Sequence, residues 1–83
     1  MEPTQEQTPS VPEPFDLLTP RELQIATRLA IGATNSEIAD ELDISVKTVD
    51  THRMHVMRKV EARNNVALAR LALRVGLTTL DAA

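Results

Sequence analysis

Apolar residues recur at helical spacing along most of the chain, and the pattern predicts four helices. The first is expected to begin after Thr19, with Pro20 in its first turn, and to end at Gly32. Its start carries the signature of a capping box, because Glu22 stands three positions after Thr19. The apolar positions that follow at helical spacing are Leu23, Ile25, Ala26, Leu29 and Ala30.

Two more helices are predicted directly afterwards, separated by a tight turn. Thr34 and Glu37 form a second capping box for a short helix, and the chain must bend at Asp43 where that helix ends. Ser45 is placed to cap a third helix over about residues 45–60. The positions expected to face the core are Val46, Val49, Val56 and Val60, with His52 or Arg53 filling the turn between them.

A fourth helix is expected from Asn64 to about Val75, with Gly76 as its stop. It is apolar nearly all round, and one helix of so small a domain cannot hide every side. We therefore expect a second copy of the chain to cover part of it. The predicted dimerisation residues are Leu68, Ala69, Ala72, Leu73 and Val75.

The N-terminal segment has a different composition. Residues 1–16 hold four of the five prolines and four acidic residues but no Lys or Arg. Such a segment cannot bury enough apolar surface to offset the entropy of ordering it. We expect a disordered arm or linker over residues 1–16 and one domain over residues 17–83, an all-α four-helix bundle that contains a helix-turn-helix.

Composition excludes several functions. The 83 residues contain no Cys, two His and one aromatic residue, which excludes disulfides and thiol chemistry and disfavours metal cages and base-stacking platforms. No paired nucleophile and base is evident, so we expect no catalytic residues, no metal and no cofactor. The sequence offers neither a membrane span nor a signal peptide, and we expect a cytoplasmic protein.

The net charge of −3 argues against a nucleic-acid partner, but its distribution argues for one. Residues 45–63 carry five basic residues against two acidic ones, whereas residues 35–43 carry four acidic residues and no base. A helix-turn-helix in this arrangement can place its basic third helix in the DNA major groove. A charge run can also simply solvate an exposed face.

Several residues at fixed spacings form one specific pattern. They are Leu18-Thr19-Pro20-Arg21-Glu22, Gly32, Asn35-x-Glu37-Ile38-Ala39, Ser45-x-Lys47-Thr48-Val49-x-x-His52 and Lys59. Over about residues 17–77 the chain thereby resembles the LuxR-type helix-turn-helix, which also ends many response regulators of the NarL/FixJ group. The resemblance implies a four-helix DNA-binding domain that dimerises through its last helix and binds double-stranded DNA.

Position by position, the resemblance implies DNA contacts from the third helix. The implied base contacts are Asp50, Thr51 and Met54, and the implied phosphate contacts are Lys47, Thr48, Arg58 and Lys59. His55 also points outward and is a further candidate phosphate contact. His52 matches the family's fixed histidine but is expected to be a packed, hydrogen-bonded structural residue.

The chain departs from the family pattern at four positions. Asp50 stands where Lys is frequent, Arg28 where Leu is common, Ile31 at a usually polar position, and Ala67 where Glu often completes a capping box. Three roles stay open for Asp50: accepting a hydrogen bond from a cytosine amino group, holding neighbours such as Arg53, or repelling non-cognate DNA.

These observations predict a dimeric, sequence-specific transcription regulator, for which RNA polymerase is a candidate further partner. The alternative is a protein-interaction module such as an anti-activator, which keeps the fold but binds DNA weakly or not at all. The acidic isoelectric point of about 5.2 and Asp50 favour that alternative, and the retained Lys47, Thr48 and Lys59 speak against it.

Overall fold

The computed structural model describes residues 11–77, and within this range it consists of helices without strands. The elements are a short 3₁₀ helix η2 (Phe15–Leu17) and the α-helices α1 (Pro20–Ala30), α2 (Asn35–Leu42), α3 (Val46–Val60) and α4 (Asn65–Val75). The predicted all-α fold with a helix-turn-helix, formed by α2 and α3, is confirmed.

The predicted caps are present at the start of every α-helix. The Thr19 side chain accepts from the backbone N–H of Glu22, whose carboxylate accepts from the Thr19 N–H, and Thr34 and Glu37 repeat this arrangement at α2. Ser45 and Asn64 cap α3 and α4, and the Asn64 Oδ1 accepts from the Ala67 N–H at 2.8 Å. These bonds satisfy backbone donors that a helix start leaves without an intrahelical partner.

The turn between α2 and α3 depends on one left-handed residue. Asp43 closes α2 with φ 57° and ψ 47°, and the chain then reaches Ser45, the cap of α3, two residues later. Asp is one of the few residues other than Gly that adopts this conformation with tolerable strain. The predicted bend at Asp43 is thus confirmed, and it fixes how steeply α2 meets α3.

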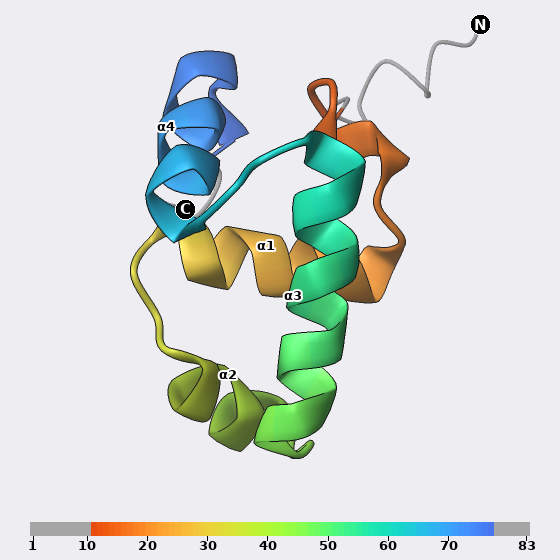
Figure 1. The fold of residues 1–83 in the computed structure, drawn as a ribbon, viewed down its shortest axis with the longest axis vertical. Coiled ribbons are helices and arrows are strands. Elements are labelled where there is room, and N and C mark those ends of the chain that lie inside the picture. The colour runs from red at the N-terminus through yellow and green to blue at the C-terminus, as the bar shows by residue number, and fades with distance from the viewer. Residues whose placement is uncertain (1–10, 78–83) are drawn as a thin grey trace, which may run out of the picture.

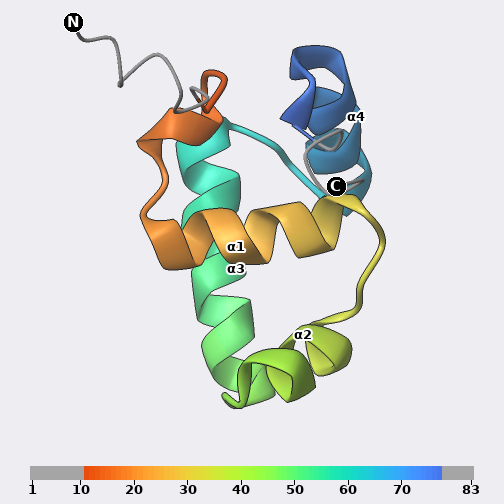
Figure 2. The ribbon, with the colours of Figure 1, turned by 180° about the vertical axis from the view of Figure 1, so that it is seen from behind.

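The helices pack around α1 and α3, which cross each other (Figure 1). In Figure 1, α3 lies in front and no other helix covers it. Figure 2, the view from behind, shows α1 in front of α3. α2 packs against α3, and α4 packs against α1. One side of α3 is therefore left open, opposite the side that contacts α1.

The core gathers apolar side chains from all of these elements. Those buried without measurable exposure include Ile25, Ala26, Ile38, Val49, Val56, Leu68, Ala72 and Leu77. Val46 differs from the prediction, because it is 47% exposed at the first turn of α3. Val46 is the first residue of α3, and the buried stripe of this helix begins at Val49.

The N-terminal boundary also needs correction. Phe15 was assigned to a disordered arm ending at residue 16, but its side chain is fully buried in the core. The 3₁₀ helix holds it there, with Val11 and Leu18 packed around the same cluster. A segment rich in proline and acidic residues can still contain one large apolar anchor, which its average composition does not reveal. The other part of the predicted arm, residues 1–10, lies outside the described residues.

Candidate nucleic-acid interface

The open side of α3 carries four exposed side chains that share one face of the helix. They are Lys47, Thr51, Met54 and Arg58, spaced at i, i+4, i+7 and i+11, and Met54 is 58% exposed. We call this set the reading face. The opposite side of the same helix is Val49, Val56 and Val60, all buried. The amphipathic division of α3 thus presents a mixed polar, basic and apolar strip to the surroundings.

Thr51 makes a hydrogen bond that changes what it can offer a ligand. Its Oγ1 donates to the backbone carbonyl of Lys47 at 3.1 Å, one turn earlier. Because the single hydroxyl proton is used inside the helix, the side chain presents acceptor lone pairs and a methyl group outward. Such a surface suits a thymine methyl or a base amino group.

The start of α3 is exposed and polar. Ser45 Oγ accepts from the Thr48 backbone N–H at 3.0 Å and lies 2.8 Å from the Thr48 hydroxyl. Lys47 and Thr48 are both exposed beside this cap. A helix start with a basic side chain next to it favours an anion such as a DNA phosphate.

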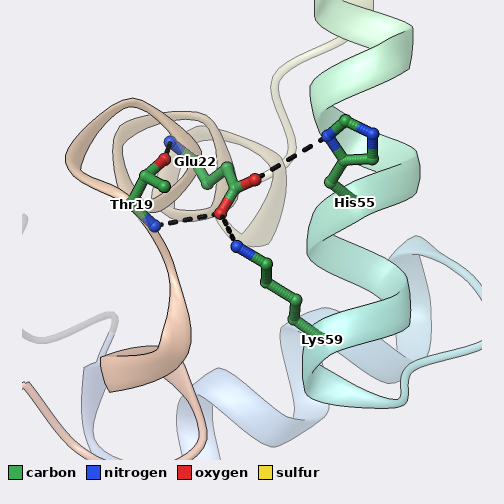
Figure 3. Close-up of polar contacts among 4 residues, drawn as sticks. All are labelled: Thr19, Glu22, His55 and Lys59. Carbon is green, nitrogen blue, oxygen red and sulfur yellow. Dashed lines mark hydrogen bonds and ion pairs between the residues drawn. The ribbon is translucent and has the colours of Figure 1, made fainter.

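One buried carboxylate, that of Glu22 on α1, binds a basic side chain at the edge of α3 nearest α1 (Figure 3). Glu22 is only 5% exposed, and its Oε1 accepts from Lys59 Nζ at 2.7 Å and from the Thr19 backbone N–H at 2.9 Å. His55 Nδ1 lies 3.8 Å from the other oxygen. The hydrogen bond from Lys59, together with that from Thr19, holds the pKa of Glu22 below its ordinary value of 4.5.

One predicted phosphate contact, Lys59, is therefore already bound to the protein itself, and a second, His55, lies beside the same carboxylate. The Lys59 ammonium is bound to Glu22 and its side chain is 34% exposed, whereas the His55 side chain is 42% exposed. Both residues stand beside the reading face on α3 rather than on it, at a position we call its rim. The sequence could not show this, because Glu22 and Lys59 are 37 positions apart.

The other edge of α3 carries Asp50, which is held by a neighbouring arginine. Arg53 Nη1 lies 3.5 Å from Asp50 Oδ1, and Arg53 Nε donates to Asn65 Oδ1 at 3.1 Å. One of the three roles left open for Asp50, contact with Arg53, is present in the structure. The Asn65 contact could not be predicted from the sequence, because it depends on where α4 begins relative to α3.

Arg28 and His52 lie away from the reading face, one in an ion pair and the other partly buried. Arg28 Nε donates to both oxygens of Glu41, at 3.1 and 2.9 Å, and so joins α1 to the acidic α2. His52 is half-buried as predicted, but its buried Nδ1 lacks the hydrogen bond that we expected. Among residues 11–77, no group of three potential metal ligands comes together, and no helix is long and apolar enough to cross a membrane.

The predicted dimerisation residues divide into three groups. Leu68 and Ala72 are fully buried in the core of the same chain, so their assignment to an interface is wrong. Ala69 and Val75 are half-buried, and Leu73 is 68% exposed. Val66, which was not predicted, is 63% exposed and shares a face with Ala69 and Leu73 at i, i+3 and i+7. We call Val66, Ala69 and Leu73 the α4 stripe.

Comparison with known proteins identifies what this arrangement resembles. The family model described as "Bacterial regulatory proteins, luxR family" matches residues 16–72. The chain is 44% identical over 63 residues to the uncharacterized response regulatory protein YgeK of Escherichia coli (strain K12), covering 76% of this chain and 43% of that protein. It is 42% identical over 65 residues to the oxygen regulatory protein NreC of Staphylococcus carnosus (strain TM300), covering 78% and 30% respectively.

A solved structure shows the same fold. The crystal structure of full-length FixJ from B. japonicum superposes with a TM-score of 0.69 at 41% identity, covering 76% of this chain and 31% of that one. The chain thus spans less than half the length of these relatives. The matched region contains the helix-turn-helix and its supporting helices.

Proposed function

This chain belongs to the luxR family of bacterial regulatory proteins and carries its helix-turn-helix DNA-binding domain, and we propose that it regulates transcription as a sequence-specific homodimer. The observation that carries the proposal is the reading face. It is exposed, it lies on the side of α3 opposite the buried valines, and it combines two basic side chains with two side chains suited to base edges. A helix of this kind fits the major groove.

Base contacts are assigned to Thr51, Met54 and Asp50. Thr51 and Met54 lie in the middle of the reading face, and Asp50 stands one turn before Met54 at its edge. Phosphate contacts are assigned to Lys47 and Thr48 at one end of α3 and to Arg58 at the other, with His55 and Lys59 at the rim. Contacts at both ends of a recognition helix fix its register on the duplex.

Dimerisation is assigned to the α4 stripe. Two exposed apolar side chains on one helical face, Val66 and Leu73, are the surface that a second copy would cover. A two-fold dimer would place two copies of α3 about one DNA turn apart. Phosphate neutralisation should dominate the affinity, so that binding weakens steeply with salt.

Selection from a randomised duplex library tests this function, because it reports the preferred sequence and the spacing of half-sites together. We expect one short motif, recovered twice at a fixed spacing. Fluorescence anisotropy with random-sequence duplex at low salt accompanies it, and salt-sensitive binding is expected. Absence of both would overturn the proposal in favour of a module that contacts only proteins.

A further inference from the structure

Arg53 links Asp50, at the edge of the reading face, to Asn65, the first residue of α4, and we propose that it determines DNA specificity at one base pair by positioning Asp50. The inference rests on the proposed function, since it assumes that α3 lies in the major groove. It goes beyond that function because it gives a role in specificity to Arg53, which is not among the assigned DNA contacts. Arg53 acts through a carboxylate that would otherwise disfavour the approach of phosphates.

The geometry fixes the guanidinium from two sides. Its Nε donates to Asn65 Oδ1 at 3.1 Å, and its Nη1 lies 3.5 Å from Asp50 Oδ1. A guanidinium is planar, so contacts through Nε and Nη1 in two directions orient the whole group. Asn65 is itself anchored, because it is the first residue of α4 and follows the cap Asn64.

The exposures fit a supporting role for Arg53 and a contact role for Asp50. The Arg53 side chain is 29% exposed, whereas the Asp50 side chain is 50% exposed. A carboxylate has about four lone-pair positions, so one contact with Arg53 leaves capacity for a further hydrogen bond. Asp50 and the strongly exposed Met54 stand one helical turn apart on α3.

The charge of Asp50 makes this support necessary. A carboxylate that approaches a polyanion is repelled unless a cation lies beside it, and Arg53 supplies that cation. In the major groove, an aspartate oxygen accepts from the N4 amino group of cytosine, which no other base presents in the same pattern. With Arg53 beside it, the Asp50 carboxylate can therefore accept a hydrogen bond from one base, and Asn65 holds the arginine in place.

Selection from a randomised duplex library tests the inference on the full chain, four variants and one control variant. The chain is expected to prefer cytosine roughly tenfold at one position, the size of a usual single-base-pair discrimination. Asp50→Ala and Arg53→Gln should each remove this preference, and the double variant should lose no more than either. Arg53→Lys keeps the charge but cannot form the two-sided contact, so it should also lose the preference.

The control is Arg21→Gln, which removes one exposed positive charge on α1 without touching the reading face. It should keep the cytosine preference, and circular dichroism should show equal helix content in all variants. The inference is overturned if Arg53→Gln keeps the preference, or if it weakens every position of the motif alike, as a purely structural role would. A native chain that selects no sequence would overturn the proposed function itself, and this inference with it.

Discussion

Lys59 Nζ lies 2.7 Å from Glu22 Oε1, so the last turn of α3 is bound to the first turn of α1. Glu22 is at once the capping-box residue of α1 and the partner of a basic residue at the rim of the reading face. One carboxylate therefore fixes the start of the supporting helix and the position of the helix proposed to enter DNA.

This double role predicts how Glu22→Gln affects stability. Glutamine can still cap α1 but offers no charge to Lys59, and we expect the free energy of unfolding at pH 7 to fall by about 1 kcal/mol. Urea denaturation followed by circular dichroism measures it. Glu37→Gln is the matched control, since Glu37 forms the same capping box at α2 from an exposed position. An equal loss in both variants would contradict the role of Lys59.

The lowered pKa of Glu22 predicts an acid dependence of stability. A carboxyl whose pKa is lower in the folded than in the unfolded chain stabilises the fold above its unfolded pKa, here near 4.5. That contribution is lost as the pH falls through the lower, folded pKa. The free energy of unfolding should thus fall more steeply below pH 4.5 in the native chain than in Glu22→Gln. Parallel pH profiles from urea titrations would show that Glu22 is not responsible.

Lys59→Ala should lower both the stability of the fold and the affinity for DNA, whereas Arg58→Ala should lower the affinity with little change in stability. Removing Lys59 leaves a nearly buried carboxylate without its main partner, and about 1–2 kcal/mol of stability should be lost. Affinity for all duplexes should fall alike, because a phosphate contact carries no sequence information. Arg58 is exposed, so Arg58→Ala should lower affinity with little change in stability. Anisotropy titrations over a range of salt concentrations measure the DNA affinity of both variants. A changed sequence preference in either variant would refute the assignment of phosphate contacts.

Local signals in the sequence predicted the helices of this domain well. Thr19, Thr34, Ser45 and Asn64 cap them because a cap is decided within four residues. Helical spacing likewise predicts three of the four valines assigned to the core side of α3, all except Val46. Contacts between distant segments were not accessible in the same way. The pairs Glu22–Lys59 and Arg53–Asn65 exist only because α3 lies across α1 and ends beside the start of α4.

The same limit explains the errors at the surface of α4. A helix that is apolar nearly all round gives no sequence signal for which side faces its own core. The packing of α4 on α1 buries Leu68 and Ala72 and exposes Val66 and Leu73.

Thr51→Ala should change the preference among DNA sequences and leave non-specific affinity nearly unchanged. The Thr51 hydroxyl is bonded to the Lys47 carbonyl, so the methyl group is what the variant Thr51→Ser removes from the outward surface. We expect both variants to lose discrimination of about 1 kcal/mol at one base pair, which a library selection detects. Lys47→Ala serves as the comparison, since it should weaken all sequences together. Unchanged selected motifs in both threonine variants would remove Thr51 from the base contacts.

Leu73→Asp and Leu68→Ala distinguish the outer and inner sides of α4. Leu73 is 68% exposed, so a charge there should weaken dimers and binding to paired half-sites while the chain stays folded. Leu68 has no exposed surface, and Leu68→Ala should lower the free energy of unfolding by about 2–5 kcal/mol. Sedimentation on a duplex with two half-sites and urea denaturation measure the two effects. A Leu73→Asp chain that occupies paired half-sites as well as the native chain would place the interface elsewhere.

Phe15→Ala tests whether the folded domain begins before residue 16. The ring is fully buried among the core residues, and its loss should lower the free energy of unfolding by about 3–5 kcal/mol. A small domain has only about 5–15 kcal/mol in total, so the variant should be partly unfolded at moderate temperature. Leu17→Ala is the control, because Leu17 lies in the same 3₁₀ helix but is 60% exposed. Thermal and urea unfolding measure the stability of both variants. Equal stability would show that residues 11–16 do not belong to the folded domain.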